Sequence, residues 1–361
     1  MQERKLDPNG RLTMTMIPIN EFRPISRLEV PNEPRTRAKF PVIDMHNHLL
    51  RTSNSAMVLE RMDRFNIRLI VDMDGFWDER IDFQLETYVN RYPGRFSIFG
   101  RVDMLRVDEP DFAGYVKRRL ADCAARGATG IKVSKSLGVK LVGRDGRYLK
   151  PDDDRLRVVW EEAAKLDFPV TIHIGDPPCF FDKVIDGTHE RYEELATHLH
   201  WSYGNRPCPR FEELMDAQEN LLYHNPDTRF VIAHIGSHAE NLREVSRMLD
   251  AYPNMYVDTA ERISELGRQP YTARDFLINY QDRVIYGTDL IPNETNVSGY
   301  YRFFETKDEY FPYNSWDEHH QGRWNIYGVY LPDEVLKKLY YKNALRVAPR
   351  LKKLIGDDEI T

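Results

Sequence analysis

The feature that most constrains the fold of this chain is an alternation of short apolar runs with amphipathic segments along almost its whole length. The short runs are rich in β-branched residues and end in polar clusters, whereas the segments between them carry apolar residues at helical spacing. Such a pattern predicts parallel strands joined by helices, in a closed barrel or an open doubly wound sheet. The eight expected strands are Val42–Asp44, Arg68–Met73, Phe96–Val102, Gly130–Ser134, Pro169–Ile174, Arg229–Ile235, Met255–Asp258 and Arg283–Tyr286.

Helices are expected between these strands and after the last one. An open dinucleotide-binding sheet needs a glycine-rich turn after its first strand, whereas here that strand runs into Met45-His46-Asn47-His48. The pattern therefore favours an α/β fold of the (β/α)8 barrel type, as a single domain over residues 41–350, with an N-terminal arm over 1–40 and a C-terminal tail over 351–361. The expected helices are Ala56–Phe65, Ile81–Arg91, Asp111–Arg126, Asp154–Leu166, Phe211–His224, Glu240–Tyr252, Thr272–Tyr280 and Pro332–Val347.

Two connections are too long to be simple turns, Gly175–Arg210 after the fifth strand and Leu290–Leu331 after the eighth. Long loops that follow barrel strands gather on the face where chemistry takes place. The second loop is dense in aromatic residues, including Tyr300, Tyr301 and Phe303. These rings predict either the wall of a substrate pocket or a packed loop core or subunit interface.

Charge and composition exclude several classes of function. The 361 residues carry a formal charge of −6, which gives no basic surface for nucleic acid. No stretch approaches the roughly 18 apolar residues of a membrane span, and the first 40 residues lack a signal-peptide pattern, so a cytoplasmic location is expected. Three cysteines without C-x-x-C spacing argue against a disulfide framework or a cysteine zinc site.

Histidines at the ends of expected strands predict a metal site. His46 and His48 lie two residues apart on an extended backbone, so both imidazoles point to one side with α-carbons roughly 6.6 Å apart. The same spacing recurs at His198 and His200, but there it ends a helix-like stretch, in which such side chains point apart. We therefore expect the first pair, and not the second, to bind a cation.

Three more side chains of metal-binding type end other strands. They are His173 on the fifth strand, His234 on the sixth and Asp289 on the eighth. In a closed parallel barrel these ends ring one opening, where all five side chains would meet. Imidazole and carboxylate donors without thiolate predict zinc, manganese or iron rather than calcium.

Together with the phrases Phe-Val-Ile-Ala-His-Ile-Gly and Arg-Val-Ile-Tyr-Gly-Thr-Asp, this arrangement resembles the amidohydrolase superfamily, in its branch of metal-dependent TIM-barrel hydrolases and decarboxylases. The resemblance implies His46, His48, His173 and Asp289 as metal ligands. It implies that His234 polarises or protonates the substrate, that Asp289 carries the proton of the attacking water, and that the enzyme forms a homo-oligomer such as a dimer. We expect one divalent ion, Zn²⁺ first, with Mn²⁺ or Fe²⁺ as alternatives.

Lys132 on the fourth strand bears on the number of metal ions. In two-metal members of the superfamily a carboxylated lysine at this strand bridges the ions, and otherwise the residue would face a substrate carboxylate as a cation. We expect one ion. Further candidates for substrate binding are Arg51, Arg101, Arg262 and His238.

The expected activity is hydrolysis of a small amide, lactone or ester by metal-activated water. Non-oxidative decarboxylation of a small carboxylic acid is the alternative, because the same ligands and a cationic side chain would serve it equally well. A non-catalytic binding protein is a third reading, disfavoured because a binder does not need acid-base residues beside a metal.

Overall fold

A computed structural model of the chain describes residues 18, 21, 24–314 and 321–355, without the side chain of Arg51. The chain divides into a short unit, Met1–Pro31, and a large one, Asn32–Thr361. Most of the expected arm and the end of the expected tail lie outside the described residues. The strands and helices discussed below all belong to the large unit.

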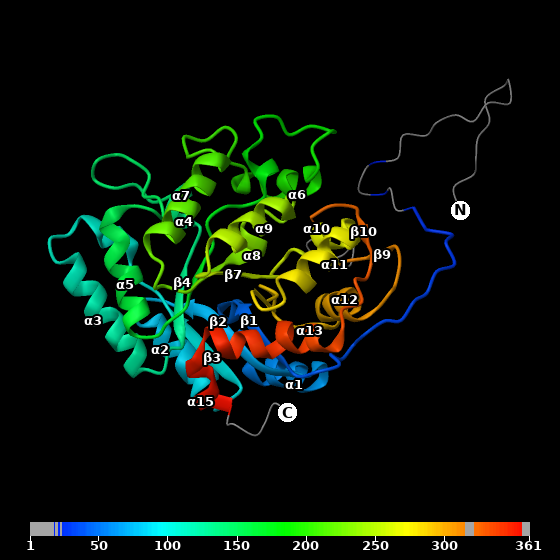
Figure 1. The fold of residues 1–361 in the computed structure, drawn as a ribbon, viewed down its shortest axis with the longest axis horizontal. Coiled ribbons are helices and arrows are strands. Elements are labelled where there is room, and N and C mark those ends of the chain that lie inside the picture. The colour runs from blue at the N-terminus through cyan, green and yellow to red at the C-terminus, as the bar shows by residue number, and fades with distance from the viewer. Residues whose placement is uncertain (1–17, 19–20, 22–23, 315–320, 356–361) are drawn as a thin grey trace. The chain divides into compact units, whose positions relative to one another are not determined.

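Eight parallel strands form one sheet in the order of the sequence, from β1 to β8 (Figure 1). Backbone hydrogen bonds from Met45 N to Tyr286 O (3.0 Å) and from Asp289 N to His46 O (2.7 Å) join the last strand to the first. The sheet is thus a (β/α)8 TIM barrel, as predicted. Its strands are β1 (Val42–Asn47), β2 (Ile67–Gly75), β3 (Phe96–Gly100), β4 (Gly130–Val133), β5 (Val170–Ile172), β6 (Phe230–Ile232), β7 (Met255–Asp258) and β8 (Val284–Ile285).

Helices connect these strands and lie outside the sheet (Figure 1). Two expected helices are interrupted by one wider turn each, at Leu85–Val89 and Lys338–Lys342, where the hydrogen bonds span five residues. The principal helices are α1 (Ser55–Phe65), α2 (Arg80–Gln84), α3 (Phe112–Ala125), α5 (Arg157–Lys165), α7 (Phe211–His224), α9 (Leu242–Ala251), α11 (Pro270–Asn279), α13 (Asp333–Lys337) and α14 (Asn343–Val347).

Alternation along β1 separates an apolar side from a polar one. Ile43 and Met45 pack in an apolar cluster with Val347 and Leu351 from the C-terminal helices. Asp44 and His46 point to the opposite side and are equally buried. The barrel thus holds a buried polar region, which is costly unless its members pair with one another.

The long loop after β8 contains a helix that the sequence pattern did not predict, α12 (Glu294–Glu305). Its rings Tyr300, Tyr301 and Phe304 are buried and pack against Tyr286 and Tyr340. Of the two roles considered for these aromatic residues, the structure supports the packed core.

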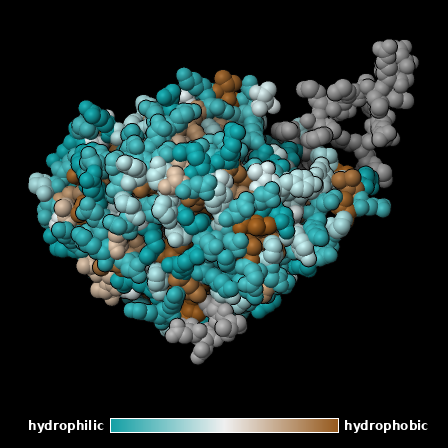
Figure 2. All heavy atoms as spheres, viewed as in Figure 1, coloured by the Kyte–Doolittle hydropathy of each residue, from teal (hydrophilic) through white to brown (hydrophobic). Residues whose placement is uncertain are grey.

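The outer surface is mainly hydrophilic, with small scattered hydrophobic patches on the face seen in Figure 2. None of the helices in the described ranges combines the length and the apolar character needed to cross a membrane.

Candidate metal centre

Two histidines, His46 and His48, lie at the end of β1, and the Nδ1 atom of each contacts a carboxylate. His46 Nδ1 lies 2.8 Å from Asp258 Oδ2 at the end of β7, and His48 Nδ1 lies 2.7 Å from Asp74 Oδ1 at the end of β2. A carboxylate accepts a hydrogen bond, so Nδ1 carries the proton in both rings and Nε2 carries the lone pair. Carboxylates in this position orient metal-binding histidines and raise their basicity.

His234 follows β6 in a backbone of unusual shape. Residues 234–237 all have positive φ, at 61°, 54°, 67° and 62°, a conformation that costs energy for residues other than glycine. The main chain of His234 is held by a bond from its N to Asp258 Oδ1 (2.9 Å), and its Nδ1 donates to Ala260 O (2.9 Å). The Nε2 of His234, which carries the lone pair, lies 3.2 Å from His173 Nδ1, and the ring centroid lies 5.3 Å from that of His46.

Three donor atoms, from His46, His234 and Asp289, all lie within 4.8 Å of one another. His48 adjoins them, because its Nε2 is 3.7 Å from Asp289 Oδ1. Asp289 has a positive φ of 62°, and its backbone N is bonded to His46 O. Converging lone pairs and one carboxylate form a donor set that fits a divalent metal ion.

His173 completes the group of five expected side chains. Its Nδ1 is 3.2 Å from His234 Nε2, and its Nε2 is 3.3 Å from Asp176 Oδ1. Asp176 also accepts bonds from Lys135 Nζ (2.6 Å) and Tyr203 OH (2.7 Å). The pKa of Asp176 lies far below its usual range because, although burial raises it, Lys135 and His173 lower it more.

Burial favours the neutral form of His48, His173 and His234. It lowers the pKa of His173 to about 4, despite the opposing influence of Asp176. Burial also lowers the pKa of His48 and, further still, that of His234. Neutral imidazole is the form that binds metal ions, so the electrostatics of the site agree with its geometry.

Lys132, on β4, belongs to the same group. Its Nζ lies 2.9 Å from His46 Nε2, and the side chain is buried. Burial lowers the pKa of Lys132 to about 8, while Asp289 and Asp258 oppose this change. The amine thus lies at the centre, next to a nitrogen that would bind the ion.

Arg101, Arg262 and His238, the other predicted substrate-binding residues with described side chains, each have their own set of partners. Arg101 donates to Met73 O (2.8 Å) and Asp74 Oδ1 (3.1 Å), and Arg262 is buried with a bond to Glu261 O (2.6 Å). His238 is half-buried with its ring 4.9 Å from that of Phe211, and burial lowers its pKa. The side chain of Arg51 lies outside the described residues.

The carboxylates that contact the histidines, Asp74, Asp258 and Asp176, were not among the predicted site residues. The first two lie at the ends of β2 and β7, so the strand-end position that marks the candidate ligands marks them as well. Asp176 lies three residues after His173 in a loop, where no pattern marks its role.

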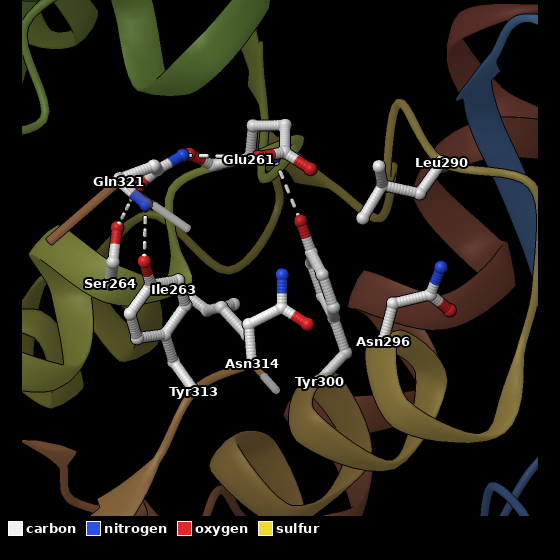
Figure 3. Close-up of a pocket in the computed structure, with 9 residues that line it drawn as sticks. All are labelled: Glu261, Ile263, Ser264, Leu290, Asn296, Tyr300, Tyr313, Asn314 and Gln321. Carbon is white, nitrogen blue, oxygen red and sulfur yellow. Dashed lines mark hydrogen bonds between the residues drawn. The ribbon is translucent and has the colours of Figure 1, made fainter. Parts of the chain in front are cut away.

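Two cavities are lined by residues that follow the barrel strands. One, of about 220 Å³, is lined by Lys132, Arg101 and side chains that follow β3 and β4. The other, of about 20 Å³, lies beside Leu290 and has room for about one water molecule. Figure 3 shows Gln321 at the edge of the second cavity, where it bonds to Glu261 (3.0 Å) and Ser264 and so joins the segment after β8 to the segment after β7.

The second His-x-His pattern is not part of the centre. His198 and His200 flank the start of a short turn, Leu199–Trp201, and His200 is exposed. The His198 ring stacks on Trp201 with centroids 4.2 Å apart.

Comparison with known proteins agrees with this geometry. A family model described as Amidohydrolase matches residues 29–349, whereas no curated protein sequence matches the chain. Similar solved structures include a dihydroxybenzoic acid decarboxylase from Polaromonas sp. JS666 with bound manganese and the inhibitor 2-nitroresorcinol, at 16% identity and a TM-score of 0.55, covering 86% of this chain and 97% of that one.

Two further structures are similar over 86% of this chain and 99% of their own length. One is a putative amidohydrolase from Staphylococcus aureus, with 16% identity and a TM-score of 0.53. The other is a 2,6-dihydroxybenzoate decarboxylase complexed with 2,6-dihydroxybenzoate, with 17% identity and a TM-score of 0.52. At these identities the structures support the fold, while the family model covers most of the sequence. The chain therefore belongs to the amidohydrolase family of enzymes, and the donors gathered at the ends of its barrel strands fit a divalent metal ion.

Proposed function

We propose that this chain is a hydrolase of a small amide, lactone or ester that uses one divalent metal ion. The ion would be held by His46, His48, His173 and Asp289, with His234 beside it. The observation that carries the proposal is the clustering of these side chains. Donor atoms of His46, His234 and Asp289 lie within 4.8 Å of one another, His48 Nε2 lies 3.7 Å from Asp289 Oδ1, and His173 Nδ1 lies 3.2 Å from His234 Nε2. Zn²⁺, Mn²⁺ and Fe²⁺ all accept such nitrogen and oxygen donors.

A divalent ion bound there would polarise a substrate carbonyl and lower the pKa of a water molecule. The carboxylate of Asp289 is one of the clustered donors. It would accept the proton of the attacking water and pass that proton to the leaving group. His234 offers the lone pair of Nε2, because its Nδ1 donates to Ala260 O. We assign His234 the role of stabilising charge on the substrate oxygen: Nε2 would take a proton from solvent, donate it in a hydrogen bond to that oxygen, and release it to solvent after the product leaves.

The role of His234 can be separated from metal binding. His234→Asn should keep metal content near that of the unmodified protein and lower kcat by about 10² to 10⁴, the usual contribution of an acid-base group. Metal content is measured by elemental analysis of the purified protein. Loss of the ion in this variant would instead place His234 among the ligands.

Lys132 is proposed to act as an unmodified amine, which requires one ion per chain. Elemental analysis of the fully loaded protein should give a metal-to-protein ratio near one, and the intact mass should show no added carboxyl group. A ratio near two would replace this assignment with the version in which a carboxylated Lys132 bridges two ions.

Turnover in H₂¹⁸O tests the reaction itself. Metal-loaded protein supplied with panels of amides, lactones and esters should release an acid that carries the solvent ¹⁸O, and a chelator should abolish this release. Activity that survives complete removal of metal would contradict the proposal.

Decarboxylation of a small carboxylic acid is the second candidate, and one observation favours it. Two cationic side chains, Arg101 and Lys132, line the 220 Å³ cavity next to the centre and would hold a substrate carboxylate. This reaction would release CO₂ and place a solvent proton on carbon. Deuterium incorporation at carbon, without ¹⁸O in the product, would identify it.

A further inference from the structure

The 220 Å³ cavity combines a buried apolar wall with polar side chains, which are Lys132 and Arg101 together with Asp103, Ser134 and Ser136. It lies at the ends of β3 and β4, and Val102, Met104, Val133 and Leu137 are all buried there. Leu141 and Trp77 extend the same wall and are partly accessible. An apolar wall in an accessible cavity favours an apolar ligand group, because burial removes that group from water.

Lys132 links this cavity to the candidate metal centre, because its side chain contacts both. It lines the cavity, and its Nζ is 2.9 Å from His46 Nε2. Arg101 also lines the cavity. Among the described residues, its Nε donates a hydrogen bond to Met73 O and its Nη2 donates one to Asp74 Oδ1. A guanidinium has five N–H groups, so Arg101 retains donors for a ligand oxygen while Asp74 holds it in place.

The volume limits the size of the group that fits. An engineered apolar cavity of about 150 Å³ accommodates benzene, whereas sites for drug-sized molecules span about 300 to 1,000 Å³. At about 220 Å³ this cavity holds one ring or a branched chain of similar bulk.

The other cavities found among the described residues lack this combination. The cavity of about 690 Å³ beside Phe211 carries charged side chains such as Lys183, Arg206 and Glu240, and no bond from its lining side chains to the five expected donors is found among the described residues. The one of about 560 Å³ near Arg35 is lined mainly by charged groups. The one of about 20 Å³ in Figure 3 is too small for a substrate.

We propose that the substrate is a carboxylic acid or acyl compound bearing one compact apolar group of about ring size, and that this group lies in the cavity between the ends of β3 and β4. The inference rests on the proposed function, because it takes the reacting group to lie at the donor set. It adds the chemical class of the remainder of the substrate and names the residues that select it.

Binding of simple acids tests the proposal without knowledge of the natural substrate. Acetate, benzoate and cyclohexanecarboxylate are titrated by calorimetry into the full chain, once loaded with Mn²⁺ and once free of metal. The two ring acids should bind with a Kd at least about tenfold lower than that of acetate in both forms, since they bury more apolar surface. Equal affinities for all three acids would overturn the proposal.

Two variants locate the effect. Leu141→Trp fills the cavity and should remove the preference for ring acids over acetate. Val142→Trp adds the same bulk at the neighbouring residue, which is 45% exposed and does not line the cavity, and should retain the preference. An equal loss in both variants would overturn the assignment of this cavity.

A third variant guards against misfolding of Leu141→Trp. Leu141→Ala enlarges the cavity and should improve binding of 2-naphthoate relative to benzoate by at least about threefold, as expected when added apolar atoms become buried. An unchanged ratio of the two affinities would overturn the proposal.

The metal-free titrations distinguish failure of this inference from failure of the proposed function. A chain that takes up no Mn²⁺ but still prefers ring acids contradicts the proposed function alone. Uptake of Mn²⁺ without that preference contradicts this inference alone.

Discussion

The chain carries the His-x-His pattern twice, and the two copies lie in opposite environments. His46 and His48 end a buried strand, and a carboxylate lies within 2.8 Å of Nδ1 in each ring. His198 and His200 lie in a loop, where one ring stacks on Trp201 and the other is exposed. The comparison shows that one spacing occurs in two different environments. Only His46 and His48 combine an extended backbone with a carboxylate beside each Nδ1, which is the environment we expect of metal ligands.

The largest difference in metal affinity between the two histidine pairs is expected when a predicted ligand is removed. His48→Ala or His173→Ala should weaken metal binding more than about 100-fold, beyond the range for residues that only support a ligand. Equilibrium titration against a metal indicator measures the change, with His200→Ala as the matched control. Metal affinity that stays at its original level in His48→Ala would refute the ligand assignment.

A smaller effect is expected from the supporting carboxylates. Asp258→Asn or Asp74→Asn should weaken metal binding by about 10- to 100-fold, because the ring keeps its place but loses its charged partner. The control is Asp182→Asn, since Asp182 Oδ2 lies 3.7 Å from His189 Nε2, away from the centre. If all three variants bind metal alike, the acceptors behind the rings do not explain the difference between the two pairs.

The buried site should also make stability depend on pH. The pKa of His173 is about 4 in the folded chain and about 6.5 in an unfolded one, so the unfolded state binds more protons between these values. Stability of the metal-free protein therefore falls as the pH is lowered from 7 to 5, with His173 contributing about 2 kcal/mol of that loss.

Denaturant unfolding at both pH values of the unmodified protein and of His173→Gln measures this contribution. The variant should lose less stability on acidification, while His200→Gln should match the unmodified protein. The same pH dependence in all three proteins would show that burial of His173 does not control its protonation.

The smallest effect is expected from the pair in the loop, His198 and His200. Replacing either with Ala should leave metal content unchanged, and His200→Ala should alter the free energy of unfolding by less than about 0.5 kcal/mol, as is usual for surface sites. A loss of metal in either variant would remove the contrast on which the assignment is based.

The order of the strands was predictable from the sequence, because the spacing of apolar residues distinguishes strands from helices. The gathering of the five strand-end side chains was predictable as well, because the ends of parallel barrel strands meet at one opening. The sequence of α12 also has a helical pattern, since Val297, Tyr300, Tyr301 and Phe304 follow helical spacing and Asn293 caps the first turn. The expectation of a loop rests on the chemistry of these aromatic residues and not on their spacing, and so it does not include this buried helix.

Contacts between distant strands could not be predicted in the same way. The pairing of His46 with Asp258 spans 212 residues, and only the closed barrel brings them together. The positive φ values at His234 and Asp289 also have no sequence signal, because glycine does not mark these positions. Such departures from local preference are typical of functional sites.

The bonds that close the barrel have a consequence for how the protein assembles. Thr288 N donates to Asp44 Oδ1 across 244 residues of sequence, next to the bond from Asp289 N to His46 O. The seam that joins the ends of the sheet is thus also the place where the donors meet. A nascent chain cannot capture its ion until its final strand has emerged and docked, so metal retention would report that the cylinder has been completed.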